Sequence, residues 1–277
     1  MKVVLFCGGL GMRLREYSEA IPKPMVPIGH RPMLWNIMKY YAHFGHKDFI
    51  LCLGWQGAAI KHYFLNYDEC ASNDFVLSSG GQVDLLASDI HDWRITFVDT
   101  GLTASIGQRL KQVQRFVSGE ERFLANYSDG LTDLHLPTLI DFAERQDTVA
   151  TCVNVRPNQS FHIMRSDAQG LATDLLPVAG ADVWMNGGYF VLKQEVFDYL
   201  HEGEDLMAEP ARRLIAERQF SVFKHDGFWG SMDTYKEKQQ LDDMHARGET
   251  PWAVWKNEQP ATAASPKRSV RAAARPR

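Results

Sequence analysis

The sequence predicts an α/β fold with a parallel central sheet, and three features of its first part support this prediction. Val3–Phe6 is an apolar, β-branched run typical of a buried strand, and residues 49–53 form a second such run. Residues 32–44 and 58–67 instead carry apolar side chains at helical spacing. Such an alternation of strands and helices places a parallel sheet between helical layers.

The later segments continue this alternation and add a hairpin. Further strands are predicted at 94–98, 123–127, 149–155, 188–192 and 220–223, and further helices at 106–117, 136–145, 206–218 and 234–246. Residues 68–92 show no clear period, which indicates an insertion at the sheet edge. A turn at 168–170 predicts a hairpin from residue 163 onward. The predicted fold class is α/β, a Rossmann-like three-layer sandwich with a mixed, mostly parallel central sheet.

The chain is predicted to form one domain, residues 1–256, followed by a disordered basic tail, residues 257–277. Its 277 residues are enough for one large core. The tail carries a charge of +4. Since the formal net charge of the whole chain is −4, residues 1–256 carry a charge of −8. The charged tail residues are Glu258, Lys267, Arg268, Arg271, Arg275 and Arg277. An Ala-, Pro- and Arg-rich tail favours disorder, and an acidic domain argues against nucleic acid as a partner.

The remaining composition favours a cytoplasmic protein that does not bind membranes. No apolar run approaches the length of a membrane span, and the first residues lead directly into a strand without a signal-peptide pattern. The four cysteines are scattered and form no C-x-x-C pair. Three of them lie in apolar stretches, which indicates buried, reduced thiols rather than disulfides or zinc ligands.

A glycine-rich turn follows the first strand and predicts an anion site. Gly8, Gly9 and Gly11 would give backbone N–H groups access to a close anionic ligand. Arg13 and Lys23 add positive charge nearby, and prolines on both sides restrict the backbone of Lys23. The pattern is no Walker loop, because no Gly-Lys-Ser/Thr follows, and it lacks the third glycine and the acid of a dinucleotide fingerprint. A triphosphate site is therefore expected, and an NAD-dependent oxidoreductase is disfavoured.

This turn and several later motifs resemble the sugar-1-phosphate nucleotidylyltransferases, and within that family the glucose-1-phosphate cytidylyltransferases most. The resemblance covers roughly Met1 to Trp255. It rests on the segments 8–14, 22–25, 34–38, 98–101, 127–130, 186–190, 227–229 and 232–234. It implies a nucleotidyltransferase fold and transfer of a nucleotidyl group from a nucleoside triphosphate, CTP favoured, to a sugar 1-phosphate, glucose 1-phosphate favoured. The products would be a nucleoside diphosphate sugar and pyrophosphate.

The resemblance also implies a role for particular residues. Arg13, Lys23 and Asp129 would be catalytic, and Asp129 and Asp233 would share one Mg²⁺. The implied nucleotide contacts are Phe6, Cys7, Gly8, Gly9, Leu10, Gly11, Arg13, Lys23, Arg109 and Ser128. Structural alternatives stay open, because Asp129 could serve only a turn, Asp233 a helix N-cap and Arg109 a helix surface.

The sugar side departs from the family pattern. Met12 and Ser128 replace a threonine and a glycine, and residues 174–178 lack the lysine that contacts the sugar phosphate in relatives. Arg165 is the favoured replacement over Arg156 and Lys193, and Asn186 and Gly187 are expected near the sugar hydroxyls. Another nucleotide or acceptor, or a catalytically weak nucleotide-binding protein, stays an alternative. A homo-oligomer is left open.

Overall fold

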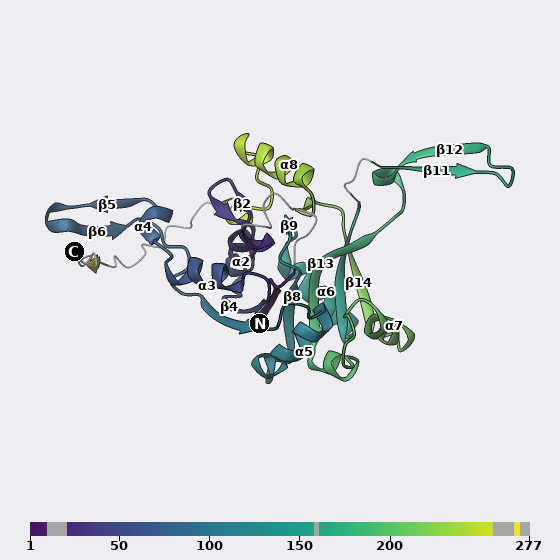
Figure 1. Ribbon diagram of the computed structural model, residues 1–277, viewed down its shortest axis with the longest axis horizontal. Helices are drawn as coiled ribbons and strands as arrows, with labels where there is room; N and C mark the ends of the chain where they lie inside the picture. The colour runs from purple at the N-terminus through teal and green to yellow at the C-terminus, as the bar shows by residue number, and fades with distance from the viewer. Residues whose placement is uncertain (10–20, 158–160, 257–268, 272–277) are drawn as a thin grey trace.

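The computed structural model describes residues 1–9, 21–157, 161–256 and 269–271, and a seven-stranded sheet forms its centre (Figure 1). The strand order is β14-β10-β13-β8-β1-β4-β7. All neighbours are parallel except β13, which runs antiparallel to β8 and β10. The strands are β1 Val3–Phe6, β4 Asp48–Leu53, β7 Arg94–Asp99, β8 Arg122–Asn126, β10 Ala150–Val155, β13 Met185–Lys193 and β14 Phe220–His225. The predicted mixed, mostly parallel sheet is confirmed.

Helices cover both faces of this sheet, as predicted. They are α2 Met33–His43, α3 Gly57–Leu65, α5 Ile106–Val117, α6 Leu136–Gln146, α7 Glu209–Ala216 and α8 Tyr235–Ala246. Side chains of β1 alternate between two cores: Val3 and Leu5 pack on the face of α2, α3, α6 and α8, whereas Val4 and Phe6 pack on the face of α5 and α7. This alternation follows from the two-residue period of a strand. The result is a three-layer sandwich.

The predicted insertion projects as an arm from one end of the molecule (Figure 1). It contains the short helix α4 Glu69–Ser72 and the hairpin β5 Phe75–Leu77 and β6 Gln82–Leu85. Its base is fixed by a buried ion pair to the short strand that precedes α2, since Arg31 Nη2 lies 2.5 Å from Asp89 Oδ2. The Arg31 guanidinium also stacks 4.4 Å from the ring of Trp35.

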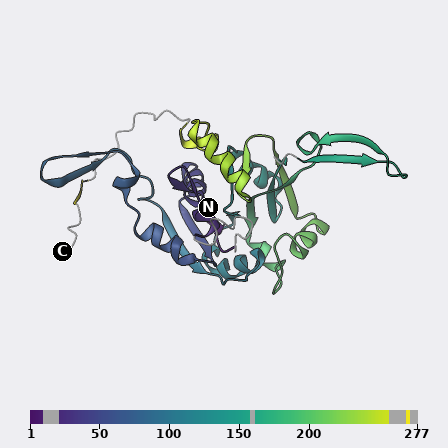
Figure 2. The ribbon, with the colours of Figure 1, turned by 45° about the horizontal axis from the view of Figure 1, so that its top comes forward.

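A second arm projects from the opposite end (Figures 1 and 2). It is the antiparallel hairpin of β11 His162–Ser166 and β12 Ala172–Pro177, where the sequence predicts one. Met164, Leu171 and Leu175 on this arm are exposed. An isolated two-stranded hairpin with exposed apolar side chains buries little surface of its own.

The C-terminal tail differs in part from its predicted disorder. Ser269–Arg271 form strand β16, which pairs antiparallel with β6. The physical reason is that β6 is an edge strand of the first arm, and its open N–H and C=O groups accept a further strand. The rest of the tail lies outside the described residues.

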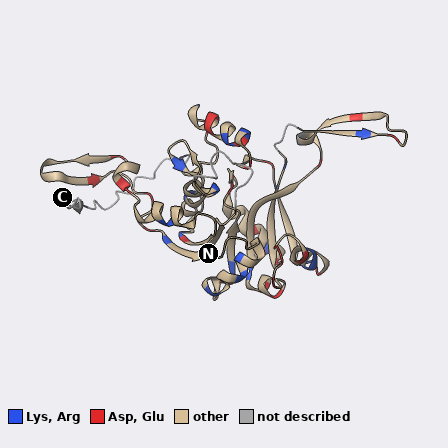
Figure 3. Ribbon diagram, in the orientation of Figure 1, with Lys and Arg blue, Asp and Glu red and all other residues tan. Residues whose placement is uncertain are grey.

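The distribution of charge and the lengths of the helices are two further features of the chain. Figure 3 shows basic and acidic segments interspersed over the body of the ribbon. In the part of the chain that the structure describes, no helix combines the length and the apolar character needed to cross a membrane.

The shorter remaining elements are η2 Lys23–Met25, β2 Pro27–Ile28, β3 Arg31–Pro32, η3 Ser79–Gly81, β9 Gly130–Thr132, η4 Val178–Gly180, η5 Gln194–Asp198, β15 Trp229–Ser231 and η6 Val254–Lys256.

Candidate active site

Three predicted site residues meet at the carboxyl edge of the sheet. The ammonium group of Lys23 donates to Asp129 Oδ2 at 2.8 Å and to Asp233 Oδ1 at 2.6 Å. The two carboxylate oxygens can therefore lie no farther apart than the sum of these distances. The Lys23 side chain is 14% exposed, and those of the aspartates are 30% and 29% exposed. The ion pairs are thus partly shielded from water but open on one side.

A short antiparallel ladder brings the two aspartates together. Asp129 directly precedes β9, and Asp233 lies two residues after β15. β9 and β15 pair with each other, so that Ser231 lies opposite Gly130. The backbone N–H of Met232 also donates to the carbonyl oxygen of Asp129 at 2.9 Å. The distance between the carboxylates is therefore set by backbone hydrogen bonds rather than by flexible side chains alone.

Lys23 is held by the backbone of a proline-flanked turn. It opens the 3-10 turn η2, where the N–H of Met25 donates to the carbonyl oxygen of Pro22 at 2.8 Å. The following Pro24 is buried. Burial alone would lower the pKa of Lys23, but Asp129 and Asp233 outweigh this effect and the pKa is raised. The side chain is therefore a fixed cation at neutral pH.

The glycine turn begins where β1 ends. Cys7 N donates to Cys52 O at 2.9 Å and continues the pairing of β1 with β4. A Cβ on Gly8 would lie 2.1 Å from Arg109 Nη1, so a larger residue there would have to displace the guanidinium. Gly9 is exposed and a Cβ on it would have open space, which leaves its backbone accessible to a ligand. Three residues predicted for this turn lie outside the described residues: Leu10, Gly11 and Arg13.

Arg109 supports the glycine turn from the protein side. Its side chain is buried, and its guanidinium donates to the carbonyl oxygens of Gly8 at 2.9 Å, Leu53 at 3.1 Å and Gly101 at 2.9 Å. Burial lowers the pKa of Arg109, although a guanidinium keeps its charge in proteins. The structure therefore places this predicted nucleotide contact beneath the turn, bonded to protein oxygens. The alternative of an ordinary surface arginine is wrong, because the residue is buried.

Ser128 adopts a backbone conformation that favours glycine. Its φ is 64°, and its side chain is buried. Two contacts hold it: its N–H donates to Asn126 Oδ1 at 2.7 Å, and the Cys7 thiol lies 3.6 Å from its hydroxyl. Burial raises the pKa of Cys7 to about 12, so this thiol stays protonated. The side chains of Cys7 and Ser128, like that of buried Phe6, belong to the core, which leaves backbone groups for nucleotide contacts.

The predicted sugar-side residues Asn186 and Gly187 make hydrogen bonds to other residues of the protein. Asn186 Nδ2 donates to the Tyr127 hydroxyl at 3.0 Å, and Asn186 Oδ1 accepts from Gly188 N at 2.8 Å. The carbonyl oxygen of Gly187 accepts from Trp229 Nε1 at 2.9 Å. A Cβ on Gly187 would lie 2.9 Å from Val155 Cγ1. Asn186 is therefore held by hydrogen bonds within the protein, and Gly187 is closely packed against β10.

The three cationic residues considered for the sugar phosphate lie in different parts of the structure. Arg165 lies on β11 of the second arm, where it is exposed and paired in register with Asp174, and it is not brought to Asp129. Lys193 ends β13 at the opposite edge of the sheet and donates to Asp147 Oδ1 at 2.6 Å. Arg156 directly follows β10 at the same edge as the candidate site.

Arg156 belongs to an aromatic and charged cluster beside this edge. Its Nε donates to Asp226 Oδ1 at 2.8 Å, and its guanidinium lies 4.5 Å from the centre of the Trp184 ring. The ammonium of Lys224 lies 4.8 Å from the same ring. Two cations therefore contact one indole, next to the start of β13.

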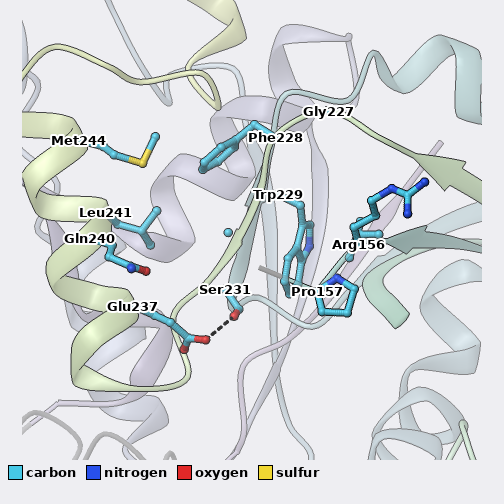
Figure 4. Close-up of a pocket in the computed structure, with 12 residues that line it drawn as sticks. Arg156, Pro157, Gly227, Phe228, Trp229, Ser231, Glu237, Gln240, Leu241 and Met244 are labelled. Atoms are coloured by element: carbon cyan, nitrogen blue, oxygen red, sulfur yellow. Dashed lines mark hydrogen bonds between the residues drawn. The ribbon is translucent and has the colours of Figure 1, made fainter. Parts of the chain in front are cut away.

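A cavity of about 290 Å³ lies between β15, α8 and the end of β10 (Figure 4). Trp229 and Ser231 line it from β15, Glu237 and Leu241 from α8, and Arg156 from the end of β10. Ser231 and Glu237 are hydrogen-bonded to each other across one end of it. The cavity therefore adjoins the segment that carries Asp233.

Asp129 and Asp233 fit the requirements of a magnesium ion. Mg²⁺ is commonly bound by one or two protein carboxylates, while substrate phosphates and water complete its shell. Its ligand oxygens lie about 2.1 Å from the ion, so two of them must come within roughly 4 Å of each other. Both carboxylates already contact one cationic nitrogen. Among the described residues, no group of three or more His, Cys, Asp or Glu side chains forms a metal site.

Known proteins place this site in context. The profile of the family described as "Nucleotidyl transferase" matches residues 2–241. A probable glucose-1-phosphate cytidylyltransferase of Bacillus subtilis (strain 168) is 38% identical over 92% of this chain and 100% of its own length. The glucose-1-phosphate cytidylyltransferase of Salmonella typhi is 36% identical with the same coverage. The structure of HddC from Yersinia pseudotuberculosis complexed with GMP-PN superimposes with a TM-score of 0.61 at 17% identity, over 88% of this chain and 99% of the other. The chain belongs to the nucleotidyl transferase family.

Proposed function

We propose that this protein transfers the cytidylyl group of CTP to glucose 1-phosphate and releases pyrophosphate. The observation that carries the proposal is the meeting of Lys23, Asp129 and Asp233 beside the Gly8–Gly9 turn. The choice of CTP and glucose 1-phosphate is supported by the two full-length relatives that bear the name glucose-1-phosphate cytidylyltransferase. Their identity of 38% and 36% extends over both halves of the chain.

The chemistry needs positioning and charge neutralisation more than covalent participation of the protein. A phosphate oxygen of glucose 1-phosphate attacks the α-phosphorus of CTP in line and forms a new P–O bond. The bond from this phosphorus to the bridging oxygen breaks, and pyrophosphate leaves with the electron pair. The open backbone of Gly9 would approach the phosphates, and Arg109 fixes the turn from below.

Lys23 and the two aspartates would act on different charged parts of the reacting groups. Asp129 and Asp233 would hold Mg²⁺, which supplies neutralisation of the negative charge on the bridging and leaving oxygens. Lys23 would then turn its ammonium group from these carboxylates to the α-phosphate. Arg13, outside the described residues, stays a prediction for the β- and γ-phosphates.

For the acceptor phosphate we propose Arg156 in place of Arg165. Arg156 lies at the carboxyl edge of the sheet and lines the cavity next to Ser231, whereas Arg165 lies on the projecting arm. A guanidinium fork suits a phosphate dianion. The missing lysine at 174–178 also favours a second candidate, a nucleotide-binding protein with weak catalysis.

We also propose that the protein is located in the cytoplasm and forms a homo-oligomer. All four cysteines are free, as suits a reducing compartment. The exposed apolar side chains of the second arm would be covered in an oligomer, which supports assembly of several copies.

A pyrophosphate-release screen tests the proposal. It crosses the five common nucleoside triphosphates with a panel of sugar 1-phosphates in the presence of Mg²⁺. CTP with glucose 1-phosphate should give the highest kcat/KM. A higher value for another pair would refute the assigned base or sugar. Nucleotide binding without pyrophosphate release from any pair would favour the weak binder.

A further inference from the structure

The carboxylate of Glu237 is bonded to the segment that carries Asp233. Its Oε2 accepts from the backbone N–H groups of Asp233 and Thr234, each at 2.8 Å. Its Oε1 accepts from the hydroxyl of Ser231 at 3.3 Å (Figure 4). We infer that Glu237 is a positioning residue that aims the Asp233 carboxylate at Asp129. This inference rests on the proposed function, in which both carboxylates hold Mg²⁺.

These contacts exceed what a helix cap requires. In a capping box the third helical residue accepts from the N-cap backbone, and Glu237 does so at Thr234. The comparable residue of α5, Gln108, accepts from its N-cap Ser105 at 2.7 Å. Glu237 additionally reaches the N–H of Asp233 and the hydroxyl of Ser231, both before the helix. One carboxylate thus joins the start of α8 to the end of β15.

Asp233 is consequently held from two sides. On one side, Met232 N donates to Asp129 O at 2.9 Å. On the other side, the N–H of Asp233 itself is bonded to Glu237 at 2.8 Å. Hydrogen bonds to an ionised acceptor are roughly twice as strong as neutral ones, so Glu237 restrains this peptide strongly. Without it, the backbone after Met232 gains rotational freedom, which would separate the Asp233 carboxylate from that of Asp129.

The surroundings of Glu237 allow its substitution without disturbing the core. Its side chain is half-buried and lines the cavity between β15 and α8. Glu237→Gln keeps the size of the side chain but loses the charge. Glu237→Ala removes all its acceptors. A matched control is Asp68→Ala at the N-cap of α4, because Asp68 Oδ1 accepts from Cys70 N at 2.8 Å and Ala71 N at 3.2 Å, far from Asp233 in the first arm.

The test combines direct metal binding with kinetics. Binding of Mn²⁺ to the full-length protein with a non-hydrolysable CTP analogue is followed by the electron paramagnetic resonance of free Mn²⁺. The Mg²⁺ dependence of pyrophosphate release is measured in parallel. Glu237→Ala should weaken both on the order of 10-fold or more, as outer-shell substitutions do, with the KM for glucose 1-phosphate little changed. Glu237→Gln should fall between wild type and Glu237→Ala, and Asp68→Ala should match wild type.

The two readouts separate the inference from the proposed function. If Glu237→Ala lowers the melting temperature but leaves Mn²⁺ affinity and Mg²⁺ dependence at wild-type values, Glu237 is only a helix cap and the inference is wrong. If the wild-type protein releases no pyrophosphate, the proposed function fails. Even then, a loss of Mn²⁺ affinity in Glu237→Ala but not in Asp68→Ala would support the positioning role.

Discussion

Replacing Lys23 by methionine should have opposite effects on metal binding and on turnover. In the structure the ammonium group stands between Asp129 and Asp233, where the proposed function places Mg²⁺. A metal ion that binds without nucleotide must therefore displace this ammonium group. Lys23→Met removes the competing cation and leaves two carboxylates facing each other, so the nucleotide-free protein should bind divalent metal more tightly.

The size of this effect follows from the two hydrogen bonds that Lys23 makes. A hydrogen bond to a charged group contributes about 1.5–3 kcal/mol net. The low end applies here, because the carboxylates are 30% and 29% exposed and solvent screens them. Two such bonds give about 3 kcal/mol, or on the order of 10²-fold in affinity. Turnover should fall on the order of 10²-fold, because the cation opposite the α-phosphate is lost.

Mn²⁺ titration of the nucleotide-free protein, by calorimetry or electron paramagnetic resonance, measures the first effect, and pyrophosphate release measures the second. Lys193→Met is the matched control. Its ammonium lies 2.6 Å from Asp147 and its side chain is 15% exposed, but it lies at the opposite sheet edge. This control should leave both readouts unchanged. The reasoning is refuted if Lys23→Met binds Mn²⁺ no more tightly than wild type.

Three further predictions concern the stability of the fold and the reactivity of its thiols. Ser128→Gly should change the free energy of unfolding by less than about 1 kcal/mol, whereas Ser128→Val should lower it by about 2 kcal/mol, because a β-branched residue is strained at a φ of 64°; urea unfolding distinguishes them. In the native protein one thiol, that of half-buried Cys70, should react rapidly with a thiol reagent, since the other three are buried; labelling of more than one would contradict this. Burial and the N-terminal ammonium lower the pKa of His46 to about 4. Only the unfolded state then gains this proton between about pH 6.5 and pH 4, so stability falls as pH falls through this window, and His46→Gln should flatten that slope in urea unfolding.

The secondary structure was predictable because its signals are local. Val3–Phe6 is apolar throughout, as expected for a strand buried on both faces, and the structure assigns Val3 and Leu5 to one core and Val4 and Phe6 to the other. The hairpin after residue 161 was also predictable from its turn. Its direction was not, because no local pattern states whether a hairpin folds onto the sheet or projects from it. The expectation for Arg165 depended on that direction.

Sequence motifs predicted which residues form the candidate site, but no pattern predicted the strand pairing that brings them together. Asp129 and Asp233 stood out beside glycine-rich, irregular segments. Their meeting depends on β9 and β15, two strands of three residues each, which are too short to show a period. Glu237 had a visible signal, since Thr234 and Glu237 have the spacing of a capping box. No local pattern indicates that its carboxylate also reaches Asp233 and Ser231.

Arg109 shows how a charged residue in a helix can belong to the interior. It lies three residues after Ile106 and next to Leu110, on the stripe that packs against the sheet. Its guanidinium joins the ends of β1 and β4 through Gly8 and Leu53, and a Cβ on Gly54 would lie 2.9 Å from its Nη1. The oxygens that accept from it there are neutral, so they satisfy its donors without cancelling its charge. In a region of low dielectric constant this charge extends to the turn above it. Gly8 and Gly54 are therefore small so that a cation can lie directly beneath the backbone that would face the triphosphate.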